Sequence, residues 1–470
     1  MSSAEPEQAK NSVARRTFCL CAVVPVVAST ACRSADSSRL RGSGDKVNVA
    51  VIGLGGRGGF HLTDFGRLPD SRIVAVCDVN QEAMERGRAQ VERETGVKPK
   101  GYQDLRHVFD DKSVQAVVMP LPNHWHALAT IWACQAGKDV YVEKPACHNP
   151  FEGQKMIEAA RTYNRIVQVG AQSRSSPHIV KAMGLLHRGV IGKVYLAKGL
   201  CYKWRESIGH KTDGPTPPGL DWDEFLGPAP TRPYNENRYR YNWNFFWDTG
   251  NGDIGNQGIH EMDIARWGLG KQGMPGRVVS TGGKYVFDDD QETPNTQHAT
   301  FDYGDSELEF EVRGMSTGSE GGLGPDTYVR DLSPALRNFL GRLGMVKGGY
   351  VIGNLFYGSQ GWMALNRTGF HVYKGPRSEK VLEQKAGKDD DFESYNTIPH
   401  MENFLAAVRS RNYKDLKADV AVGVESANLV HLANASYRLK RELKCDELDA
   451  DAQAYLTREY RAPYVVPNKV

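Results

Sequence analysis

The sequence predicts an α/β protein in which a doubly wound parallel sheet is followed by a second, α+β domain built on an open, mostly antiparallel sheet. Over residues 46–170, apolar runs alternate with amphipathic stretches, which is the pattern of parallel strands joined by crossover helices. Beyond residue 170, strand-like alternation continues, with turn residues typical of hairpins and few helical stretches. This pattern favours antiparallel pairing. A chain of 470 residues is long enough for two domains.

The overall charge is nearly balanced. The sequence has 59 Lys and Arg against 56 Asp and Glu, a net charge of +3, and no long basic block. A nucleic-acid partner is therefore not expected.

Residues 1–45 have the composition of a targeting segment and a polar linker. Arg15 and Arg16 precede the apolar run 19–28, a pattern typical of a twin-arginine export signal. The run is short and interrupted by Pro25, so we expect no stable membrane span. We therefore expect the protein in the periplasm or cell envelope. The alternative is a disordered polar N-terminus with one apolar patch.

One cysteine of this segment, Cys32, bears on how the segment is processed. Ser29-Thr30-Ala31-Cys32 resembles a lipoprotein processing site, although the usual leucine three residues before the cysteine is missing. Cys32 is thus a candidate for a lipid anchor. The five cysteines beyond it are odd in number and scattered, and we expect neither a disulfide framework nor a metal site from them. They are Cys77, Cys134, Cys147, Cys201 and Cys445.

Residues 46–170 are predicted to form the first domain. Its expected strands are 46–53, 72–78, 114–119, 139–142 and 166–169. Its expected helices are 60–68, 81–95, 124–136 and 149–163.

Residues 171–445 are predicted to form the second domain, followed by a tail, 446–470. Its expected strands are 194–202 and several runs between 277 and 312, and its expected helices are 400–411 and 420–444. The segment 203–247 is rich in Pro, Tyr and Trp and has no regular period, which is typical of a functional loop. The Gly-rich segment 316–354 is interpreted as an inserted excursion.

A glycine motif at the end of the first strand predicts a dinucleotide site. Gly53, Gly55 and Gly58 form G-x-G-x-x-G around Arg57, and Asp78 ends the next strand. The glycines permit a tight turn, a close approach to a pyrophosphate and helix–strand contact, and the helix N-terminus faces the phosphate charge. A carboxylate at Asp78 can bind ribose hydroxyls and would repel a 2′-phosphate, so NAD is favoured over NADP. The alternative is a Gly-rich turn with a solvent-facing Asp.

Two further motifs follow the third and fourth predicted strands, at the sheet edge where doubly wound folds bind ligands. Their residues of interest are Pro122, Asn123 and His126 in L-P-N-H-W-H, and Glu143, Lys144 and Pro145 in V-E-K-P. An isolated E-K-P is more often a surface ion pair before a turn. Together with G-x-G-x-x-G, however, P-N-x-x-H and the G-K-x-V-x-x-E-K-P of residues 137–145 resemble the Gfo/Idh/MocA (glucose-fructose oxidoreductase / inositol dehydrogenase) family over residues 46–270.

The resemblance implies a Rossmann-type domain, a C-terminal substrate domain and hydride transfer between a nicotinamide and a sugar carbon. It implies that Lys144 is the active-site lysine and that Glu143 and Pro145 shape the turn beside the nicotinamide. Asn123 and His126 would border the cofactor. A cationic neighbour suits this chemistry because it stabilises a developing alkoxide.

This sequence departs from the family's second-domain motif, D-x-G-x-H. His260 is retained and is the expected general base, whereas Asn256 stands where the family has a carboxylate. Since an amide cannot accept the proton, either His260 works with Lys144 alone or Asp253 or Glu261 serves instead. A purely structural histidine at a helix start is the alternative.

Aromatic residues near this motif are candidates for sugar contacts. Trp243 and Trp247 lie in the cluster Y-N-W-N-F-F-W-D, and aromatic faces stack on sugar rings, although such clusters are more often part of a core. Gln172 and Arg174 follow the last parallel strand, where the family often places a pocket arginine.

The expected function is therefore that of an NAD-dependent sugar or polyol oxidoreductase. Outside the cytoplasm no free NAD pool exists, so the cofactor would be held tightly and recycled on the enzyme. Two alternatives remain: an NAD-dependent glycosidase working by oxidation, elimination and reduction, and a non-catalytic sugar or nucleotide sensor. By resemblance, a homo-oligomer is expected.

Overall fold

The computed structural model describes residues 46–315, 318–321, 323, 351–387 and 397–470. The predicted export signal, Cys32 and the linker lie outside the described residues, as does most of the predicted excursion 316–354. No helix among the described residues is long and apolar enough to cross a membrane.

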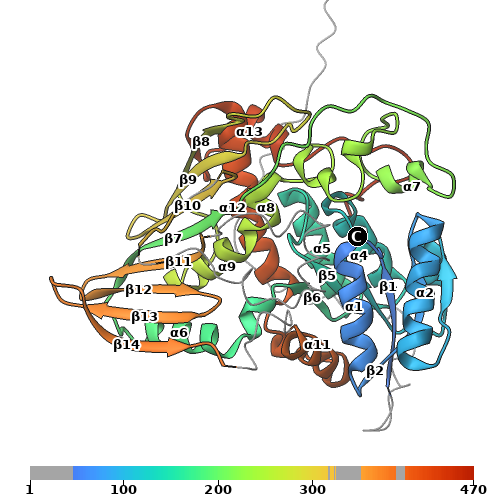
Figure 1. The fold of residues 1–470 in the computed structure, drawn as a ribbon, viewed down its shortest axis with the longest axis horizontal. Helices are drawn as coiled ribbons and strands as arrows, with labels where there is room; N and C mark the ends of the chain where they lie inside the picture. Colours follow the sequence, from blue (N-terminus) through green and yellow to red (C-terminus); the bar gives the residue numbers. More distant parts are fainter. Residues whose placement is uncertain (1–45, 316–317, 322, 324–350, 388–396) are drawn as a thin grey trace, which may run out of the picture. The chain divides into compact units, whose positions relative to one another are not determined.

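The first sheet is parallel throughout and has six strands in the order β3-β2-β1-β4-β5-β6 (Figure 1). Its strands are β1 (Val47–Ile52), β2 (Ser71–Cys77), β3 (Lys100–Tyr102), β4 (Ala116–Met119), β5 (Asp139–Glu143) and β6 (Val167–Gly170). This order reverses between β1 and β4, which creates a ligand-binding crevice at the carboxyl ends of the strands. The predicted doubly wound domain is confirmed.

The helices of this domain begin and end at the expected kinds of residue. They are α1 (Gly56–Arg67), α2 (Gln81–Thr95), α3 (Leu105–Asp110), α4 (Asn123–Gln135) and α5 (Pro150–Thr162). The Asn80 side chain caps α2, which ends at Gly96 with φ 73°, and Asn149 caps α5 ahead of a first-turn proline. α2 has its predicted bounds. α1 begins four residues earlier than predicted, because its glycines obscure the helical pattern.

The second sheet has nine strands in the order β14-β13-β12-β11-β7-β10-β9-β8-β15. Its strands are β7 (Val194–Tyr202), β8 (Arg277–Gly283), β9 (Thr296–Asp302), β10 (Glu307–Arg313), β11 (Val351–Gly358), β12 (Gly361–Asn366), β13 (Gly369–Lys374), β14 (Glu379–Lys385) and β15 (Leu443–Lys444). All neighbours pair antiparallel except β7 and β10, which are parallel. The predicted mostly antiparallel sheet is confirmed. The end of the predicted excursion is wrong, since residues 351–354 begin the central strand β11.

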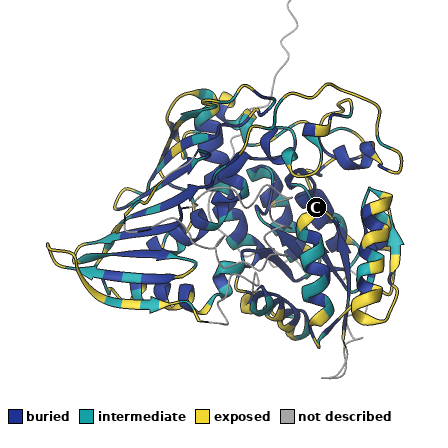
Figure 2. Ribbon diagram, viewed as in Figure 1, coloured by how far each residue is buried: buried dark blue, intermediate teal, exposed yellow. Residues whose placement is uncertain are grey.

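Helices of the second half pack on both sheets. They are α6 (Pro177–His187), α7 (Trp222–Leu226), α8 (Gly252–Asn256), α9 (Gly258–Leu269), α11 (Ile398–Ser410), α12 (Val420–Leu439) and α13 (Ala450–Tyr455). α11 joins the apolar core on one face of the first sheet with α1 and α2. The first half of α12 packs against the other face, and its second half joins the core beneath the second sheet. Both sheets are largely buried, and yellow marks the exposed surface of α2 in Figure 2.

The C-terminal tail is an ordered part of the first domain. Tyr464 and Val466 are 3% exposed and join the core that contains Trp125 and α5. Arg458 pairs at 2.9 Å with Glu152, whose side chain is 0% exposed. The last residues of the chain therefore complete the core of the domain that comes first in sequence.

Candidate active site

A cavity of about 960 Å³ lies at the carboxyl ends of the first sheet's strands and extends to the second domain. The predicted residues that line it are Gly53, Gly55, Arg57, Asp78, Pro122, Asn123, Glu143, Lys144, Gln172, Trp243, Asn256 and His260. The glycine turn and the E-K-P turn thus face the same space as the second-domain histidine.

The glycines of the turn play distinct steric roles. Gly53 has φ 96°, a conformation that favours glycine. A Cβ on Gly58 would lie 2.0 Å from the carbonyl oxygen of Gly53, so helix α1 can approach β1 only with glycine there. A Cβ on Gly55 would meet nothing within 4 Å. Since α1 has no side-chain cap and no acidic residue in its first turn, its N-terminal N–H groups are available to an anion.

Asp78 is held at the rim of this turn by two backbone groups. Its Oδ2 accepts from the Leu54 N–H at 2.7 Å and its Oδ1 accepts from the Asn80 N–H at 2.8 Å. Burial raises the pKa of Asp78, against the effect of the two N–H groups. Each carboxylate oxygen retains capacity for another hydrogen bond, such as one from a hydroxyl.

Asn123 starts α4 and is 1% exposed. Its Nδ2 is buried and has no hydrogen-bond partner among the described residues. A buried donor without an acceptor is unfavourable, so an acceptor supplied by a ligand in the cavity would satisfy it.

His126 does not line the cavity, in contrast to the prediction that it borders a cofactor. Its Nδ1 lies 2.7 Å from the carbonyl oxygen of Pro145 and its Nε2 lies 2.8 Å from that of Leu121. His126 therefore ties the L-P-N turn to the E-K-P turn from behind, and its ring is engaged on both sides.

Glu143 is a buried carboxylate that accepts several hydrogen bonds. Its Oε1 lies 3.0 Å from Arg57 Nε, 3.0 Å from His61 Nε2 and 2.8 Å from Gln172 Nε2. Although burial alone would raise it, the Arg57 charge and the contact with His61 hold the pKa of Glu143 well below its usual range. Glu143 is therefore an ionised anchor for the turn that carries Lys144.

Lys144 connects the two domains at the cavity. Its Nζ donates to the backbone carbonyl of Asn256 at 2.8 Å. Burial lowers its pKa, and the neighbouring Glu143 works in the opposite direction. The Asn256 side chain donates to the Tyr241 hydroxyl at 2.7 Å. Asn256 thus positions Lys144 through its main chain and supplies no proton acceptor to it.

His260 lies in the first turn of α9 and lines the cavity. Burial, then the charges of Lys144 and Arg367, hold its pKa well below the usual value. Its imidazole is therefore neutral near pH 7 and able to accept a proton.

The two carboxylates considered as substitutes for the family aspartate do not face the cavity. Asp253 pairs with Arg205 through three contacts of 2.5–3.1 Å. Glu261 is 3% exposed, and burial raises its pKa to about 7. The geometry favours His260 working with Lys144.

Two candidate substrate residues lie outside the cavity lining. Arg174 forms a bidentate pair with Asp263, at 2.7 and 2.8 Å, which braces α9. Trp247 lies near Tyr437, with ring centroids 6.5 Å apart, and under Arg438. Both residues serve packing between elements rather than contact with a ligand in the cavity. Trp243 does line the cavity.

Several cavity residues that the sequence interpretation did not single out come from the second domain. Among them are Lys203, Tyr239, Arg240 and Arg367. No motif marks these four, although Lys203, Tyr239 and Arg240 lie in the segment 203–247 that was interpreted as functional.

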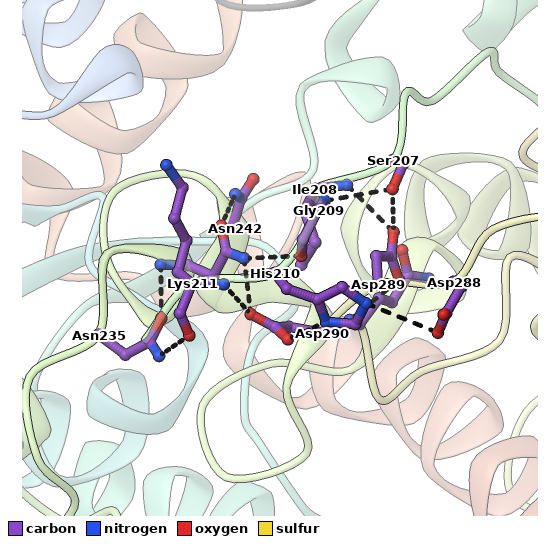
Figure 3. Close-up of polar contacts among 12 residues, drawn as sticks. Ser207, Ile208, Gly209, His210, Lys211, Asn235, Asn242, Asp288, Asp289 and Asp290 are labelled. Carbon is purple, nitrogen blue, oxygen red and sulfur yellow. Dashed lines mark hydrogen bonds and ion pairs between the residues drawn. The ribbon is translucent and has the colours of Figure 1, made fainter. Parts of the chain in front are cut away.

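Segment 203–250 crosses from the second sheet to the first domain. At its start, Asp289 and Asp290 accept hydrogen bonds from the segment, and Figure 3 shows this network. The donors are Ser207, Ile208, His210, Lys211 and Asn237. Further along, the Gln81 N–H donates to the Gly219 carbonyl at 2.9 Å and the Asp221 N–H to the Val79 carbonyl at 2.9 Å. The segment thereby forms a wall of the cavity near Asp78.

Two family models match the chain and together cover more than half of it. One describes an oxidoreductase family with an NAD-binding Rossmann fold, at residues 47–171, and the other the C-terminal α/β domain of that family, at residues 176–305. Both carry the Gfo/Idh/MocA name.

Curated relatives match between a third and a half of this chain. Levoglucosan dehydrogenase of Pseudarthrobacter phenanthrenivorans is 26% identical over 240 residues, 50% of this chain and 54% of the relative. scyllo-Inositol 2-dehydrogenase (NAD(+)) of Bacillus subtilis is 33% identical over 156 residues, 33% of this chain and 44% of the relative. The chain thus spans about half the length of the curated relatives it matches.

Solved structures share the fold over most of the chain. A levoglucosan dehydrogenase in complex with NADH and levoglucosan has a TM-score of 0.59 at 18% identity, covering 85% of this chain and 99% of that one. The WlbA dehydrogenase from Chromobacterium violaceum, in complex with NADH and UDP-GlcNAcA, has a TM-score of 0.60 at 16% identity, covering 87% and 98%. At these identities the likeness establishes the fold.

Proposed function

Because the chain belongs to the Gfo/Idh/MocA oxidoreductase family, we propose that it transfers hydride between a bound nicotinamide cofactor and a hydroxyl-bearing carbon of a sugar, polyol or glycoside. One observation carries the proposal. Lys144 from the first domain and His260 from the second line the same cavity as the glycine turn.

The residues present fit a dinucleotide. The uncapped start of α1 and the open space at Gly55 suit a pyrophosphate, and the unsatisfied Nδ2 of Asn123 suits a nearby acceptor. Asp78 suits ribose hydroxyls and disfavours a 2′-phosphate, so we propose NAD rather than NADP. When bound, the nicotinamide supplies the acceptor or donor of the hydride.

The chain's own residues accept the hydroxyl proton and stabilise the charge on the substrate oxygen. The Lys144 ammonium stabilises the negative charge that develops on the substrate oxygen as hydride leaves the carbon. His260, neutral at pH 7, accepts the hydroxyl proton. Glu143 fixes the turn that aims Lys144, and the Asn256 carbonyl holds its ammonium in place.

The substrate class rests on the cavity wall and on the relatives. Tyr241 and Trp243 offer aromatic surface beside the polar groups of Asn256 and Gln257, a mixture suited to sugar rings. The relatives named above are dehydrogenases of levoglucosan and inositol. We further propose that the protein is exported with its cofactor bound and reoxidises it on the enzyme.

The test uses protein purified without added cofactor. Mass spectrometry of the released nucleotide should identify NAD, and a panel of sugars and glycosides should yield a keto-sugar with reduction of the bound cofactor. Lys144→Ala should keep the nucleotide and lower turnover by about a hundredfold or more, with Lys181→Met, on the exposed face of α6, as the matched control. Retained activity in Lys144→Ala would refute the assigned role.

Other outcomes identify the other functions. Aglycone release without net reduction would indicate the glycosidase. Unchanged cofactor and sugars across the panel, with sugar binding intact, would indicate a sensor.

A further inference from the structure

Residues 217–241, which we call the covering segment, are anchored to the first domain directly beside Asp78. The main chain of residues 219–221 pairs with that of residues 79–81 through two hydrogen bonds of 2.9 Å and an antiparallel bridge. This pairing joins the second half of the chain to the strand end that carries the expected ribose-binding carboxylate.

Two aromatic rings of the covering segment face the cavity next to this anchor. Phe225, in α7, and Tyr239 both line the cavity, and their ring centroids lie 5.2 Å apart in an edge-on arrangement. Burial raises the pKa of Tyr239, and the Asp78 carboxylate raises it further, so the Tyr239 hydroxyl lies within electrostatic range of Asp78. The covering segment thus presents an aromatic surface whose polar edge is near Asp78.

Apolar residues of the first domain line the cavity together with these rings. Val79 packs against the aromatic cluster around Phe225, and Leu105 begins α3; both line the cavity. Groups from both halves of the chain therefore enclose a space that protein atoms do not fill. An adenine base suits such a space because aromatic rings stack on its faces, and its ribose would then lie beside Asp78.

Main-chain carbonyls at the end of α7 are held by side chains of the first domain. The Trp125 Nε1–H donates to the Glu224 carbonyl at 2.9 Å, and His124 Nε2 lies 2.8 Å from the Phe225 carbonyl oxygen. The Glu224 side chain also forms an ion pair with Arg106 of α3. These contacts fix the position of Phe225 at the cavity wall.

The C-terminal tail binds the same short helix. Arg461 donates to the Asp223 carbonyl at 2.7 Å and to the Ala229 carbonyl at 3.2 Å, and it pairs with the Asp223 carboxylate at 2.8 Å. The Tyr464 hydroxyl donates to the Glu224 carboxylate at 2.7 Å. Because Tyr464 belongs to the core of the first domain, the tail fastens the covering segment to that domain.

We propose that the covering segment closes over the adenosine half of a bound NAD, with Phe225 and Tyr239 against the adenine and ribose, and that the C-terminal tail holds it closed. The inference rests on the proposed nucleotide binding and names the part of the chain that retains the nucleotide. Release requires the covering segment to lift, so the bonds from Arg461 and Tyr464 to α7 oppose dissociation.

The two parts of the proposal affect the binding rates differently. A side chain that contacts the nucleotide slows dissociation and leaves association nearly unchanged. A segment that is held closed slows both the entry and the exit of the nucleotide. Tyr239 is expected to act in the first way and Arg461 in the second.

The experiment measures both rates on the full chain with NADH as the probe. Protein loaded with NADH is mixed with excess NAD, and the loss of bound NADH fluorescence gives the dissociation rate. Tyr239→Ala should raise that rate about tenfold or more, as expected for loss of an aromatic contact with a base. Arg461→Met should raise it about fivefold, because charge-assisted bonds to α7 are lost.

The association rate separates a closing segment from a simple contact. When nucleotide-free protein is mixed with NADH, association should be faster for Arg461→Met than for the wild type and nearly unchanged for Tyr239→Ala. Tyr285→Ala and Arg441→Met are the matched controls at exposed positions, and neither should change either rate. An unchanged dissociation rate in Tyr239→Ala or in Arg461→Met would overturn the proposal.

A second measurement does not depend on the folding of a variant. In the wild-type protein, amide hydrogens of residues 217–241 should exchange more slowly when NAD is present, because closure over the nucleotide suppresses local opening. Exchange in β13 should not change. Equal exchange of the covering segment with and without NAD would overturn the proposal.

The outcomes distinguish this inference from the proposed function. Slow NADH release and protection of the covering segment, without hydride transfer to any sugar, would support the closing segment and refute the oxidoreductase. Keto-sugar formation by a protein whose two variants release NADH at the wild-type rate would keep the function and overturn the closing segment. A protein that binds neither NAD nor NADH would refute both.

Discussion

Lys144 is held by the backbone carbonyl of Asn256, so its position does not depend on the side chain at residue 256. A main-chain carbonyl is present whatever residue occupies position 256. Replacement of the family carboxylate by Asn256 therefore leaves Lys144 in place and removes one proton acceptor. His260, kept neutral by burial, is then the proposed base.

The glycines of the nucleotide turn allow the steric and ligand-binding roles to be tested separately. Gly58→Ala places a methyl group 2.0 Å from the Gly53 oxygen, and we expect the free energy of unfolding to fall by about 2 kcal/mol. Gly55→Ala meets no atom within 4 Å, so its nucleotide-free form should unfold like the wild type while its nucleotide content falls.

Urea unfolding of the nucleotide-free variants checks the expected stabilities. Mass spectrometry of the released nucleotide checks the expected nucleotide content. Equal stability of Gly58→Ala and wild type would contradict the close approach of α1 to β1.

The residues that sequence reasoning found are those with local signals. Gly53, Gly58 and Asp78 are marked by their spacing along one strand–turn–helix–strand unit. In the structure Gly53 makes the turn, Gly58 allows the close helix–strand approach, and Asp78 lies at the rim of the turn. Lys203 and Arg367 have no such signal. Pairing within the second sheet brings them together, because β11 lies between β7 and β12. His126 matched a motif, yet its neighbours engage both ring nitrogens.

The predicted strands and helices of the first domain were found wherever the apolar periodicity extended over enough residues to be recognised. β3 and α3 were missed because they are only 3 and 6 residues long. The four strands β11–β14 were missed because a Gly-rich stretch precedes them. The tail was not predicted to join the first domain, since burial of Tyr464 depends on Trp125 far away in sequence.

The tail is expected to stabilise the first domain through Arg458. Arg458→Met would leave the fully buried Glu152 without its ion-pair partner, so the free energy of unfolding should fall by about 3 kcal/mol. Arg441→Met is the matched control, because Arg441 and Asp449 are 42% and 54% exposed and their pair should contribute less than about 1 kcal/mol.

Chemical unfolding of both variants gives the comparison. Equal losses in the two variants would contradict a special role for the tail.

At the scale of the whole molecule, α12 and segment 203–250 join the two halves around one cavity. The first half of α12 is buried with the first sheet and its second half with the second sheet. A cofactor in the cavity would contact groups from both halves, including Asp78 and Tyr239. This arrangement supports the proposal that the cofactor is retained rather than exchanged at each turnover.

The proposed export of the protein depends on the arginine pair Arg15 and Arg16. Arg15→Lys together with Arg16→Lys should abolish passage through the twin-arginine route, so that protein carrying nucleotide accumulates in the cytoplasm. Arg33→Lys should leave the distribution unchanged. Cell fractionation followed by nucleotide analysis measures the outcome, and an unchanged distribution of the double variant would refute the export proposal.

The burial of Tyr464 and Val466 in the first domain also determines when that domain can be completed. A ribosome makes residue 466 long after β1, so a nascent chain carries an unfinished nucleotide domain until residues 464–466 have emerged. Trp125 and the apolar residues around it stay uncovered during that time, which makes the emerging chain a client for chaperones. The nucleotide site can therefore reach its final form, and hold a nucleotide tightly, only after residues 464–466 have been synthesised.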